Sequence, residues 1–271
     1  MGWVGEGAGP EARGKRIRPL MVLLTAASAG GEWRRALPAA AAVELVHNFS
    51  LIHDDIEDNS PLRRGRATLW TRWGIPQAIN AGDAMFTVAH LSLLGLAETA
   101  SARAALEANR ILQKTCLHLT QGQYLDISYE ARGDLNLAAY WPMVGGKTAA
   151  LLAACTELGA LAAQAPEARQ AAYRQFGWTL GLAFQAQDDL LGIWGDSAVT
   201  GKSADSDLVS GKKSLPVLFG LEQNGPFARR WREGPINGEQ VADLARQLEA
   251  EGARQYTQER ANALTDQALE A

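Results

Sequence analysis

Apolar residues recur at spacings of three and four along almost the whole chain, and this pattern constrains the fold more than any other feature. Leu20, Leu23 and Leu24 near the start and Leu151 and Cys155 later are examples. Such spacing places apolar side chains on one face of a helix, and the abundant alanine and leucine also favour helix. No run alternates polar and apolar residues as a half-exposed strand would. The sequence therefore predicts an all-α protein.

Clusters of glycine, proline and polar residues divide the chain into roughly ten predicted helices. They lie at Gly30–Gly31, Asn59–Pro61, Gly74–Pro76, Arg132–Asp134, Gly195–Ser206 and Asn224–Pro226. The segments between them are too apolar to be solvated singly, so we expect them to pack as one bundle. Without an evident linker or tandem repeat, residues 1–271 are predicted to form one large helical domain.

Composition and charge exclude several classes of function. The formal net charge of −4 gives no footprint for nucleic acid. Cys116 and Cys155 lie in apolar helical runs and are expected to be buried thiols rather than a disulfide or metal pair. The longest apolar stretch, Thr148–Ala163, contains Glu157 and is too short and too polar for a membrane span. The Gly-rich start, Met1–Pro10, does not look like a signal peptide, so we expect a cytoplasmic protein.

The first acidic motif places four acids within the five residues Asp54–Asp58. On a helix Asp54 and Asp58 lie one turn apart and about 40° apart around the axis, so they can share metal ions. Clustered carboxylates repel one another, and bound divalent cations would hold them together. The alternative is a solvated acidic helix end. Against it, the motif follows the apolar run Phe49–Ile52 and precedes the basic segment Pro61–Arg66.

The second acidic motif, Phe184–Gly192, contains Asp188 and Asp189 in an apolar helix, with Gln185 on the face of Asp188. A buried carboxylate pair needs a metal or a basic partner. Lysines follow at Gly201–Lys202 and Gly211–Pro216. Two acidic motifs accompanied by Arg and Lys residues suit a diphosphate bound with magnesium. In a mostly apolar protein, the rest of the ligand should be hydrocarbon.

At this point the ordered motifs resemble those of the trans-isoprenyl diphosphate synthases, which include farnesyl and geranylgeranyl diphosphate synthases. The resemblance runs from Gly14 to Pro216, about three quarters of the chain. Each motif is weak alone, and the ordered set is highly specific. The motifs are Gly14–Pro19, Glu44–His47, Asp54–Asp58, Arg63–Gly65, Gly82–Asp83, Gly122–Gln123 with Asp126, Lys147–Thr148, Phe184–Gln185 with Asp188–Asp189, Gly201–Lys202 and Gly211–Lys212.

The resemblance implies an isoprenoid-synthase helical bundle around a central apolar cavity, magnesium dependence with three ions in each active site, and a homodimer. It implies that isopentenyl diphosphate and allylic prenyl diphosphates are the substrates. Binding of isopentenyl diphosphate is implied for Lys15, Arg18, His47 and Arg64. Binding of the allylic diphosphate is implied for Arg63, Lys147, Lys202 and Lys212. Magnesium would be held by Asp54, Asp58 and Asp188, and Thr148 and Gln185 would lie beside the developing allylic cation.

Each of these residues also has a simpler structural interpretation when taken alone. The basic residues near Lys15 could be a solvated chain start, His47 a core histidine, and Lys147 a helix lysine with its ammonium in water. The ordered set favours the functional interpretation. The implied chemistry asks no nucleophile of the protein, only electrostatic stabilisation of a leaving diphosphate and dry, apolar pocket walls.

The sequence departs from the family pattern at several places. Gly192 stands where the second motif usually has a third aspartate; we expect Asp188 to supply the metal ligand, with partial compensation by Asp196. Ala67 and Trp70 replace the proline and histidine usual after the Arg-Arg-Gly turn. The chain also begins close to its first motif, where the family has a further helix, and lacks the basic tail often seen at the end.

Three functions stay open at this stage. A short-chain synthase is favoured, with geranylgeranyl diphosphate (C20) as product and farnesyl diphosphate as the alternative. Phe49, five residues before Asp54, is the residue that the resemblance assigns to limiting product length; alternatively it is an ordinary core residue. A terpene cyclase of the same fold would need no second diphosphate pocket, and a non-catalytic partner subunit should have eroded acidic motifs.

Overall fold

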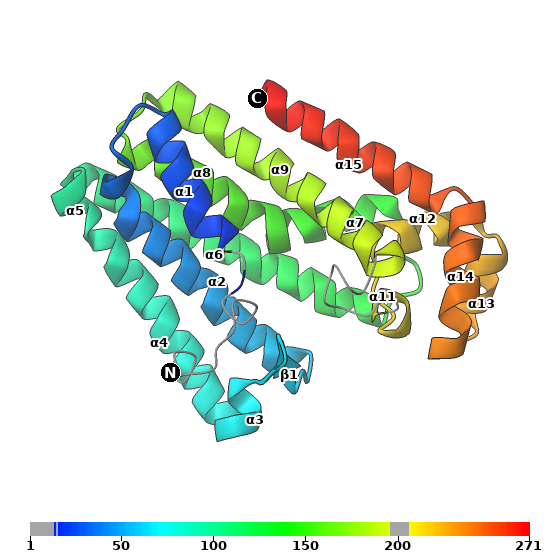
Figure 1. The fold of residues 1–271 in the computed structure, drawn as a ribbon. Helices are drawn as coiled ribbons and strands as arrows, with labels where there is room; N and C mark the ends of the chain where they lie inside the picture. Colours follow the sequence, from blue (N-terminus) through cyan, green and yellow to red (C-terminus); the bar gives the residue numbers. More distant parts are fainter. Residues whose placement is uncertain (1–13, 15, 196–205) are drawn as a thin grey trace. The chain divides into compact units, whose positions relative to one another are not determined.

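The computed structural model describes residues 14, 16–195 and 206–271, and helices dominate it (Figure 1). The first part contains α1 (Ile17–Ser28), η2 (Trp33–Ala36), α2 (Leu37–Glu57), α3 (Leu69–Trp73), α4 (Ile75–Leu94) and α5 (Leu96–Thr99). The central part contains α6 (Ala102–Glu130), α7 (Leu137–Val144), the π-helical segment η3 (Gly145–Ala149), α8 (Ala150–Ala162) and α9 (Glu167–Trp194). The last part contains α11 (Ser206–Val209), α12 (Leu215–Gln223), α13 (Pro226–Arg232), α14 (Gly238–Ala250) and α15 (Ala253–Glu270). The all-α prediction is confirmed.

The predicted chain breaks coincide with helix ends wherever the structure describes them. Gly30 and Gly31 follow α1, and Gly225 precedes α13, whose first residue is Pro226. Proline suits this first helical position because its missing N–H would have no partner there. Most of the break predicted at Gly195–Ser206 lies outside the described residues.

Two short strands, β1 (Leu62–Arg63) and β2 (Arg66–Ala67), form a hairpin after α2. Leu62 pairs with Ala67 and Arg63 with Arg66. The turn residues Arg64 and Gly65 both have positive φ angles, 52° and 72°, as a type I′ hairpin turn requires. A ladder of two residues on each side is too short to create an alternating pattern, so the sequence predicted only a loop here.

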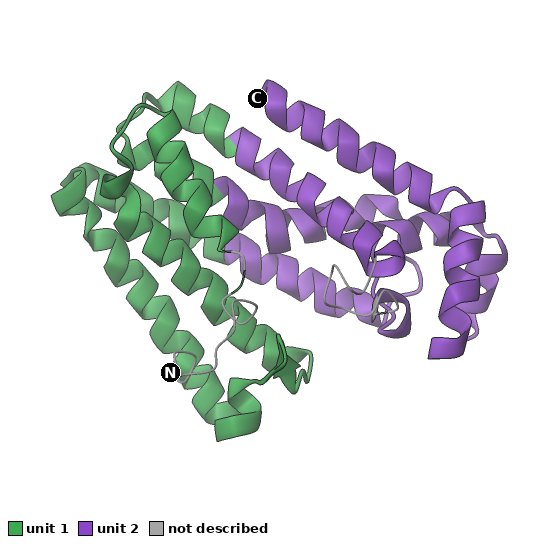
Figure 2. Ribbon diagram, in the orientation of Figure 1, with its two compact units in different colours: residues 1–116, 154–174 green, residues 117–153, 175–271 purple. Residues whose placement is uncertain are grey.

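The described residues divide into two compact units (Figure 2). Unit 1 comprises residues 1–116 and 154–174, and unit 2 comprises residues 117–153 and 175–271. In unit 1, α2 packs along α4 and against α1. Small residues of α2, among them Ala39, Ala42, Val43 and Val46, have no exposed surface. The prediction of a single domain over residues 1–271 stays a prediction.

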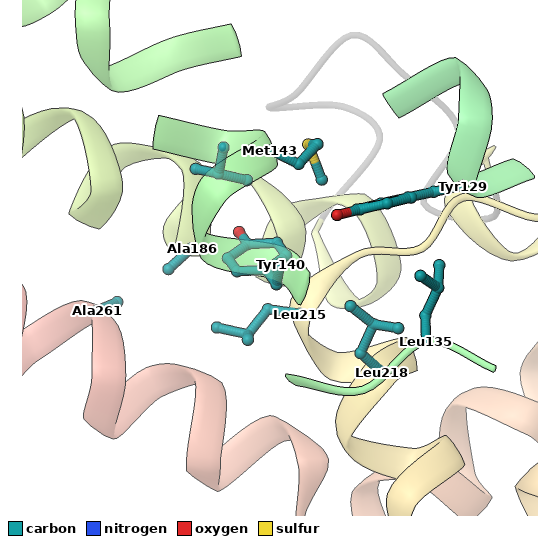
Figure 3. Packing of buried hydrophobic residues seen from close by; sticks show 9 residues of the cluster. Tyr129, Leu135, Tyr140, Met143, Ala186, Leu215, Leu218 and Ala261 are labelled. Atoms are coloured by element: carbon teal, nitrogen blue, oxygen red, sulfur yellow. The ribbon is translucent and has the colours of Figure 1, made fainter. Parts of the chain in front are cut away.

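Apolar clusters lie at two places in the described part of unit 2. One joins α7, α9, α12 and α15 around Tyr140, which is fully buried, with Met143, Ala186, Leu215 and Ala261 among its neighbours (Figure 3). The other is formed around Phe227, Leu244 and Leu248 in the C-terminal helices. The first cluster encloses a polar network that belongs to the second acidic motif, which is described below.

Two further predictions from the sequence concern the burial of the cysteines and the presence of a membrane-spanning helix. Both Cys116 and Cys155 are buried, as expected, and burial raises the pKa of each thiol to about 12. Among the described residues, no helix is both long enough and apolar enough to cross a bilayer.

Candidate active site

The first acidic motif occupies the last turn of α2, and its carboxylates divide between two environments. Asp54 is half-buried and Asp58, at the helix end, is exposed. Asp55 is only 5% exposed, and its Oδ1 accepts a hydrogen bond of 2.5 Å from Nε of Arg63. Burial raises the pKa of Asp55, and the bond from Arg63 opposes that shift. Asp55 is therefore a structural partner of the hairpin, while Asp54 and Asp58 are the more accessible acids.

The hairpin after α2 presents Arg63 and Arg64 differently. Arg63 lies in β1 and pairs with Asp55, whereas Arg64 occupies the turn. The guanidinium of Arg64 lies against Gly14, since a Cβ built on Gly14 would overlap it. Gly14 itself has a φ of 67°, where an L side chain would be strained. The two neighbouring arginines thus project toward different parts of unit 1.

Arg18 on α1 and His47 on α2 form a partly buried site whose positive charge comes from arginine. Nη1 of Arg18 lies 3.2 Å from Nε2 of His47. Burial, with the positive charges of Arg18, Arg64 and Arg63, lowers the pKa of His47 to about 3, so the imidazole is neutral at ordinary pH. Nε of Arg18 is buried and has no hydrogen-bond partner among the described residues. A buried donor without a partner is costly, and an anionic ligand would satisfy it. Lys15, predicted to join this site, lies outside the described residues.

Lys147 and Thr148 lie on η3, a type of helix turn that is common at functional sites. η3 approaches α6 very closely, because a Cβ on Gly122 would overlap the backbone nitrogen of Lys147. Nζ of Lys147 forms an ion pair with Oδ2 of Asp126 on α6. Thr148 donates a 2.8 Å hydrogen bond to Oε1 of Gln185 on α9.

The two aspartates of the second acidic motif differ in exposure, as Asp54 and Asp55 of the first motif do. Asp188 is half-buried, while Asp189 is 1% exposed and lies at the centre of a polar network. Its Oδ2 accepts bonds from the Tyr140 hydroxyl at 2.8 Å and from the Leu215 backbone N–H at 2.9 Å. Its Oδ1 accepts a 2.9 Å bond from Nε2 of Gln185. Gln185, which the sequence places on the same helix face as Asp188, thus donates to Asp189, one turn away.

Lys212 is the basic partner that the second motif was expected to need. Its Nζ lies 3.5 Å from Oδ1 of Asp189 and 3.7 Å from Oδ2 of Asp207. Burial lowers the Lys212 pKa, but the carboxylates of Asp189, Asp207 and Asp188 outweigh it and raise the pKa above its usual value. Lys202 and Asp196 lie outside the described residues.

Asp207 is a residue that the sequence reasoning missed. Its carboxylate lies against Gly192, the position of the absent third aspartate. The available signal was its place five residues before Lys212, in a segment already predicted to be functional.

Phe49 is half-buried on α2 and belongs to an aromatic group of unit 1. Its ring centroid lies 5.2 Å from that of Phe86 on α4, with the rings inclined at 76°. It also contacts His53 edge to face, at 5.6 Å. Phe86 on α4 is therefore in direct contact with Phe49.

Comparison with known proteins agrees with this fold and these motifs. The profile of the polyprenyl synthetase family matches residues 9–247, and the chain belongs to that family. A geranylgeranyl diphosphate synthase of Mycobacterium tuberculosis is 46% identical over 79% of this chain and 61% of its own length. A (2E,6E)-farnesyl diphosphate synthase of the same organism is 41% identical over 94% of this chain and 73% of its own length.

A solved structure, a polyprenyl synthetase from Streptomyces coelicolor, superposes with a TM-score of 0.89 at 39% identity. It covers 98% of this chain and 80% of the other. The resemblance predicted from the ordered motifs is thereby confirmed. The chain spans about three fifths of the length of the geranylgeranyl diphosphate synthase named above.

The donor chemistry of the acidic motifs fits magnesium. In the described part of the chain, no three His, Cys, Asp or Glu side chains form a group that could hold a metal ion by themselves. Magnesium does not need such a cage, because it binds through one or two carboxylates, waters and substrate phosphates. Asp54 and Asp58, one turn apart, and the half-buried Asp188 offer such carboxylates.

Proposed function

We propose that this protein is a prenyltransferase that joins isopentenyl diphosphate head to tail with allylic diphosphates, making a short-chain prenyl diphosphate. Family membership and the names of the relatives support this class of reaction. Geranylgeranyl diphosphate is the proposed product, and farnesyl diphosphate is the alternative. Both names occur among the relatives.

The observation that carries the proposal is the partly buried site of Arg18 and His47. Nε of Arg18 is buried without a hydrogen-bond partner among the residues that the structure describes, and the neutral imidazole adds no further charge. Arg64, and Lys15 by resemblance, would complete a pocket for the diphosphate of isopentenyl diphosphate. This pocket would hold a second diphosphate, which a cyclase that uses a single diphosphate would not need.

We propose Asp54, Asp58 and Asp188 as magnesium ligands, with three ions in each active site. The bound ions would offset the negative charge that develops on the departing diphosphate. Arg63, Lys147, Lys202 and Lys212 would bind the same diphosphate through charge-assisted hydrogen bonds. Asp126 and Asp55 orient Lys147 and Arg63 through the ion pairs described above. The network of Asp189 holds Lys212 and Gln185 in place.

The proposed reaction breaks the allylic carbon–oxygen bond and forms a carbon–carbon bond. Diphosphate leaves with the electron pair, and the alkene of isopentenyl diphosphate attacks the resulting cation. A proton is then lost, for which the departing diphosphate is the proposed acceptor. Thr148 and Gln185 are proposed to lie beside the cation, where fixed dipoles would stabilise it without ordering water. Their mutual hydrogen bond holds both oxygens in place.

Incubation of the purified protein with magnesium, labelled isopentenyl diphosphate and an allylic primer tests the proposal. We expect labelled prenyl diphosphates only when all three are present. Product from a preformed prenyl diphosphate alone would indicate a cyclase. Inactivity that a second subunit relieves would indicate a partner of a heteromeric synthase. We also propose a cytoplasmic homodimer, and sedimentation at micromolar concentration would test the dimer.

The two hairpin arginines are expected to serve different substrates. Arg64→Ala should chiefly raise KM for isopentenyl diphosphate, and Arg63→Ala should chiefly raise KM for the allylic substrate. Each loss of a charge-assisted contact should cost roughly 2–5 kcal/mol of binding free energy. Steady-state kinetics with each substrate varied in turn measures both effects. Arg66→Ala, in the same hairpin, is the control, and weakening of the same substrate by both variants would contradict the division.

Phe49 is expected to limit product length, because a growing hydrocarbon that reaches its ring cannot extend further. Phe49→Ala should shift the products toward longer chains. The ring is half-buried, so the stability loss should stay below the roughly 3–5 kcal/mol of a fully buried phenylalanine. Chromatography of the dephosphorylated products measures the shift. Phe86→Ala is the matched variant: an effect there alone would place the limiting residue on α4.

A further inference from the structure

The hydrogen bonds around Asp189 have a fixed direction, because several of its neighbours can only donate. The Leu215 backbone N–H lies 2.9 Å from Oδ2, and the Lys212 ammonium lies 3.5 Å from Oδ1. Neither group has a lone pair with which to accept. The Tyr140 hydroxyl donates to Oδ2 as well, at 2.8 Å. A carboxylate among these donors acts as an acceptor toward its remaining neighbour, Gln185.

The orientation of the Gln185 amide follows from this direction. An amide can face a neighbour with its NH2 group or with its oxygen, and only the NH2 group can donate to a carboxylate. Nε2 of Gln185 accordingly donates to Oδ1 of Asp189 at 2.9 Å. Oε1 is then the amide atom that faces Thr148, whose hydroxyl donates to it at 2.8 Å. The direction of each bond from Asp189 to Thr148 is thereby determined.

This direction decides what the Thr148 hydroxyl can offer to a ligand. A hydroxyl has one hydrogen and two lone pairs, and the hydrogen of Thr148 is engaged by Gln185. The oxygen therefore presents lone pairs, the negative end of its dipole. The side chain is only 8% exposed, and electrostatic interactions are stronger in such poorly solvated places. An enclosed oxygen of this kind suits a cationic group and disfavours an anionic one.

We propose that Asp189 is a positioning residue for the reaction, which acts through Gln185 to turn the lone pairs of the Thr148 hydroxyl toward the allylic cation. This inference rests on the proposed function, because it assumes that the cation forms beside Thr148. The opposite direction of the network would present the O–H of Thr148, whose positive end opposes the developing charge. A dipole that is fixed before the substrate binds needs no reorganisation when the charge appears.

Asp189→Asn should reverse the network while keeping its shape. The Leu215 N–H can only donate, so the oxygen of the new amide should stay beside it and the NH2 group should face Gln185. The flexible side chain of Lys212 can move away from that NH2 group. The Gln185 amide would then turn over and donate to the Thr148 oxygen. We expect kcat to fall about a hundredfold, as when one fixed dipole is lost from an active site, with KM for isopentenyl diphosphate unchanged.

A double-mutant cycle on kcat shows whether Asp189 acts through the Thr148 hydroxyl. Thr148→Val keeps the shape of the side chain and removes the hydroxyl. In that background Asp189→Asn should lower kcat by less than about threefold, because the effect that it transmits has already been lost. Thr148→Ser restores a hydroxyl and should restore the sensitivity to Asp189→Asn. Asp243→Asn, in an exposed ion pair, is the control and should leave kcat unchanged.

Two results of this cycle would overturn the proposal. One is an unchanged kcat in folded Asp189→Asn. The other is a loss of the same factor with and without the Thr148 hydroxyl, which would mean that Asp189 acts through packing or through Lys212. Melting temperatures show whether each variant is folded. If Asp189→Asn does not fold, Gln185→Leu replaces it in the cycle, since it interrupts the same path and leaves the bonds from Tyr140 and Leu215 in place. Additive losses there would equally contradict the proposal.

Binding of a cationic analogue separates this inference from the proposed function. The probe is an allylic diphosphate analogue with an ammonium nitrogen in place of the carbon that carries the charge, and its neutral counterpart has a saturated carbon there. Calorimetry with magnesium should show that the wild type prefers the ammonium analogue. Asp189→Asn should lower this preference about tenfold, the value of one charge-assisted contact.

The two hypotheses then fail in different ways. A wild type that forms no prenyl product, yet prefers the ammonium analogue through Asp189, would overturn the proposed function and leave the role of Asp189 standing. An active wild type whose preference for the ammonium analogue is the same in Asp189→Asn would overturn the role of Asp189 alone.

Discussion

Replacing Asp54 with alanine is expected to lower turnover roughly a thousandfold while leaving the protein folded. Electrostatic stabilisation by a bound metal is worth several kcal/mol in the transition state, and each 1.4 kcal/mol corresponds to about tenfold in rate. Asp54 is half-buried rather than fully buried at the end of α2, so its replacement should leave the fold intact. Turnover at saturating magnesium and the melting temperature of the same preparation are the two measurements.

Glu57 provides the control for the Asp54 variant. It belongs to the same acidic motif, is exposed, and is not among the proposed magnesium ligands. Glu57→Gln should therefore keep most of the activity. Wild-type turnover in folded Asp54→Ala would remove Asp54 from the proposed ligands, whereas equal losses in both variants would indicate a general effect of charge at this helix end.

Replacing Asp189 with alanine is expected to destabilise the protein by about 3–5 kcal/mol. That is the usual cost of removing one member of a buried charged pair. The change would leave Lys212 facing fewer carboxylates and would remove the acceptor for the Tyr140 hydroxyl and the Leu215 backbone N–H. Urea denaturation, followed by circular dichroism, would report the difference in the free energy of unfolding.

Tyr140→Phe is the matched variant for Asp189→Ala. It removes one hydrogen bond and keeps the ring in the cluster of Figure 3, so a loss of about 1–2 kcal/mol is expected. A loss below 1 kcal/mol for Asp189→Ala would show that water or neighbouring groups replace its partners. Asp189 would then not be the structural centre of the second motif.

The helical fold was predictable because it is encoded locally. Apolar residues spaced three and four positions apart indicate helices directly. The glycine and proline clusters indicate where most of these helices end. The resemblance also assigned the first acid of each Asp-Asp pair, Asp54 and Asp188, to the site. In the structure both are more accessible than the following Asp55 and Asp189, although their role as ligands stays a prediction.

The missed features are contacts between residues far apart in the sequence. Asp207 lies 15 residues after Gly192 in the sequence, and no local pattern links a glycine in one helix with an acid in another. The contact of Arg64 with Gly14 likewise depends on how the chain start returns to the hairpin. The bond from Gln185 to Asp189 was also not marked in the sequence, because both Asp188 and Asp189 lie within one turn of Gln185.

The π-helical segment Gly145–Ala149 has a consequence for the phase of the helix that contains it. A π turn holds one residue more than an α turn, so it rotates the following residues by about 100° relative to an uninterrupted α-helix. Lys147 and Thr148 lie within this segment and reach partners on two different helices, Asp126 on α6 and Gln185 on α9. To keep these two contacts, the segment must therefore keep its number of residues as well as their identity. A deletion of one residue there would keep every proposed ligand in the chain and still separate this lysine and threonine from their partners.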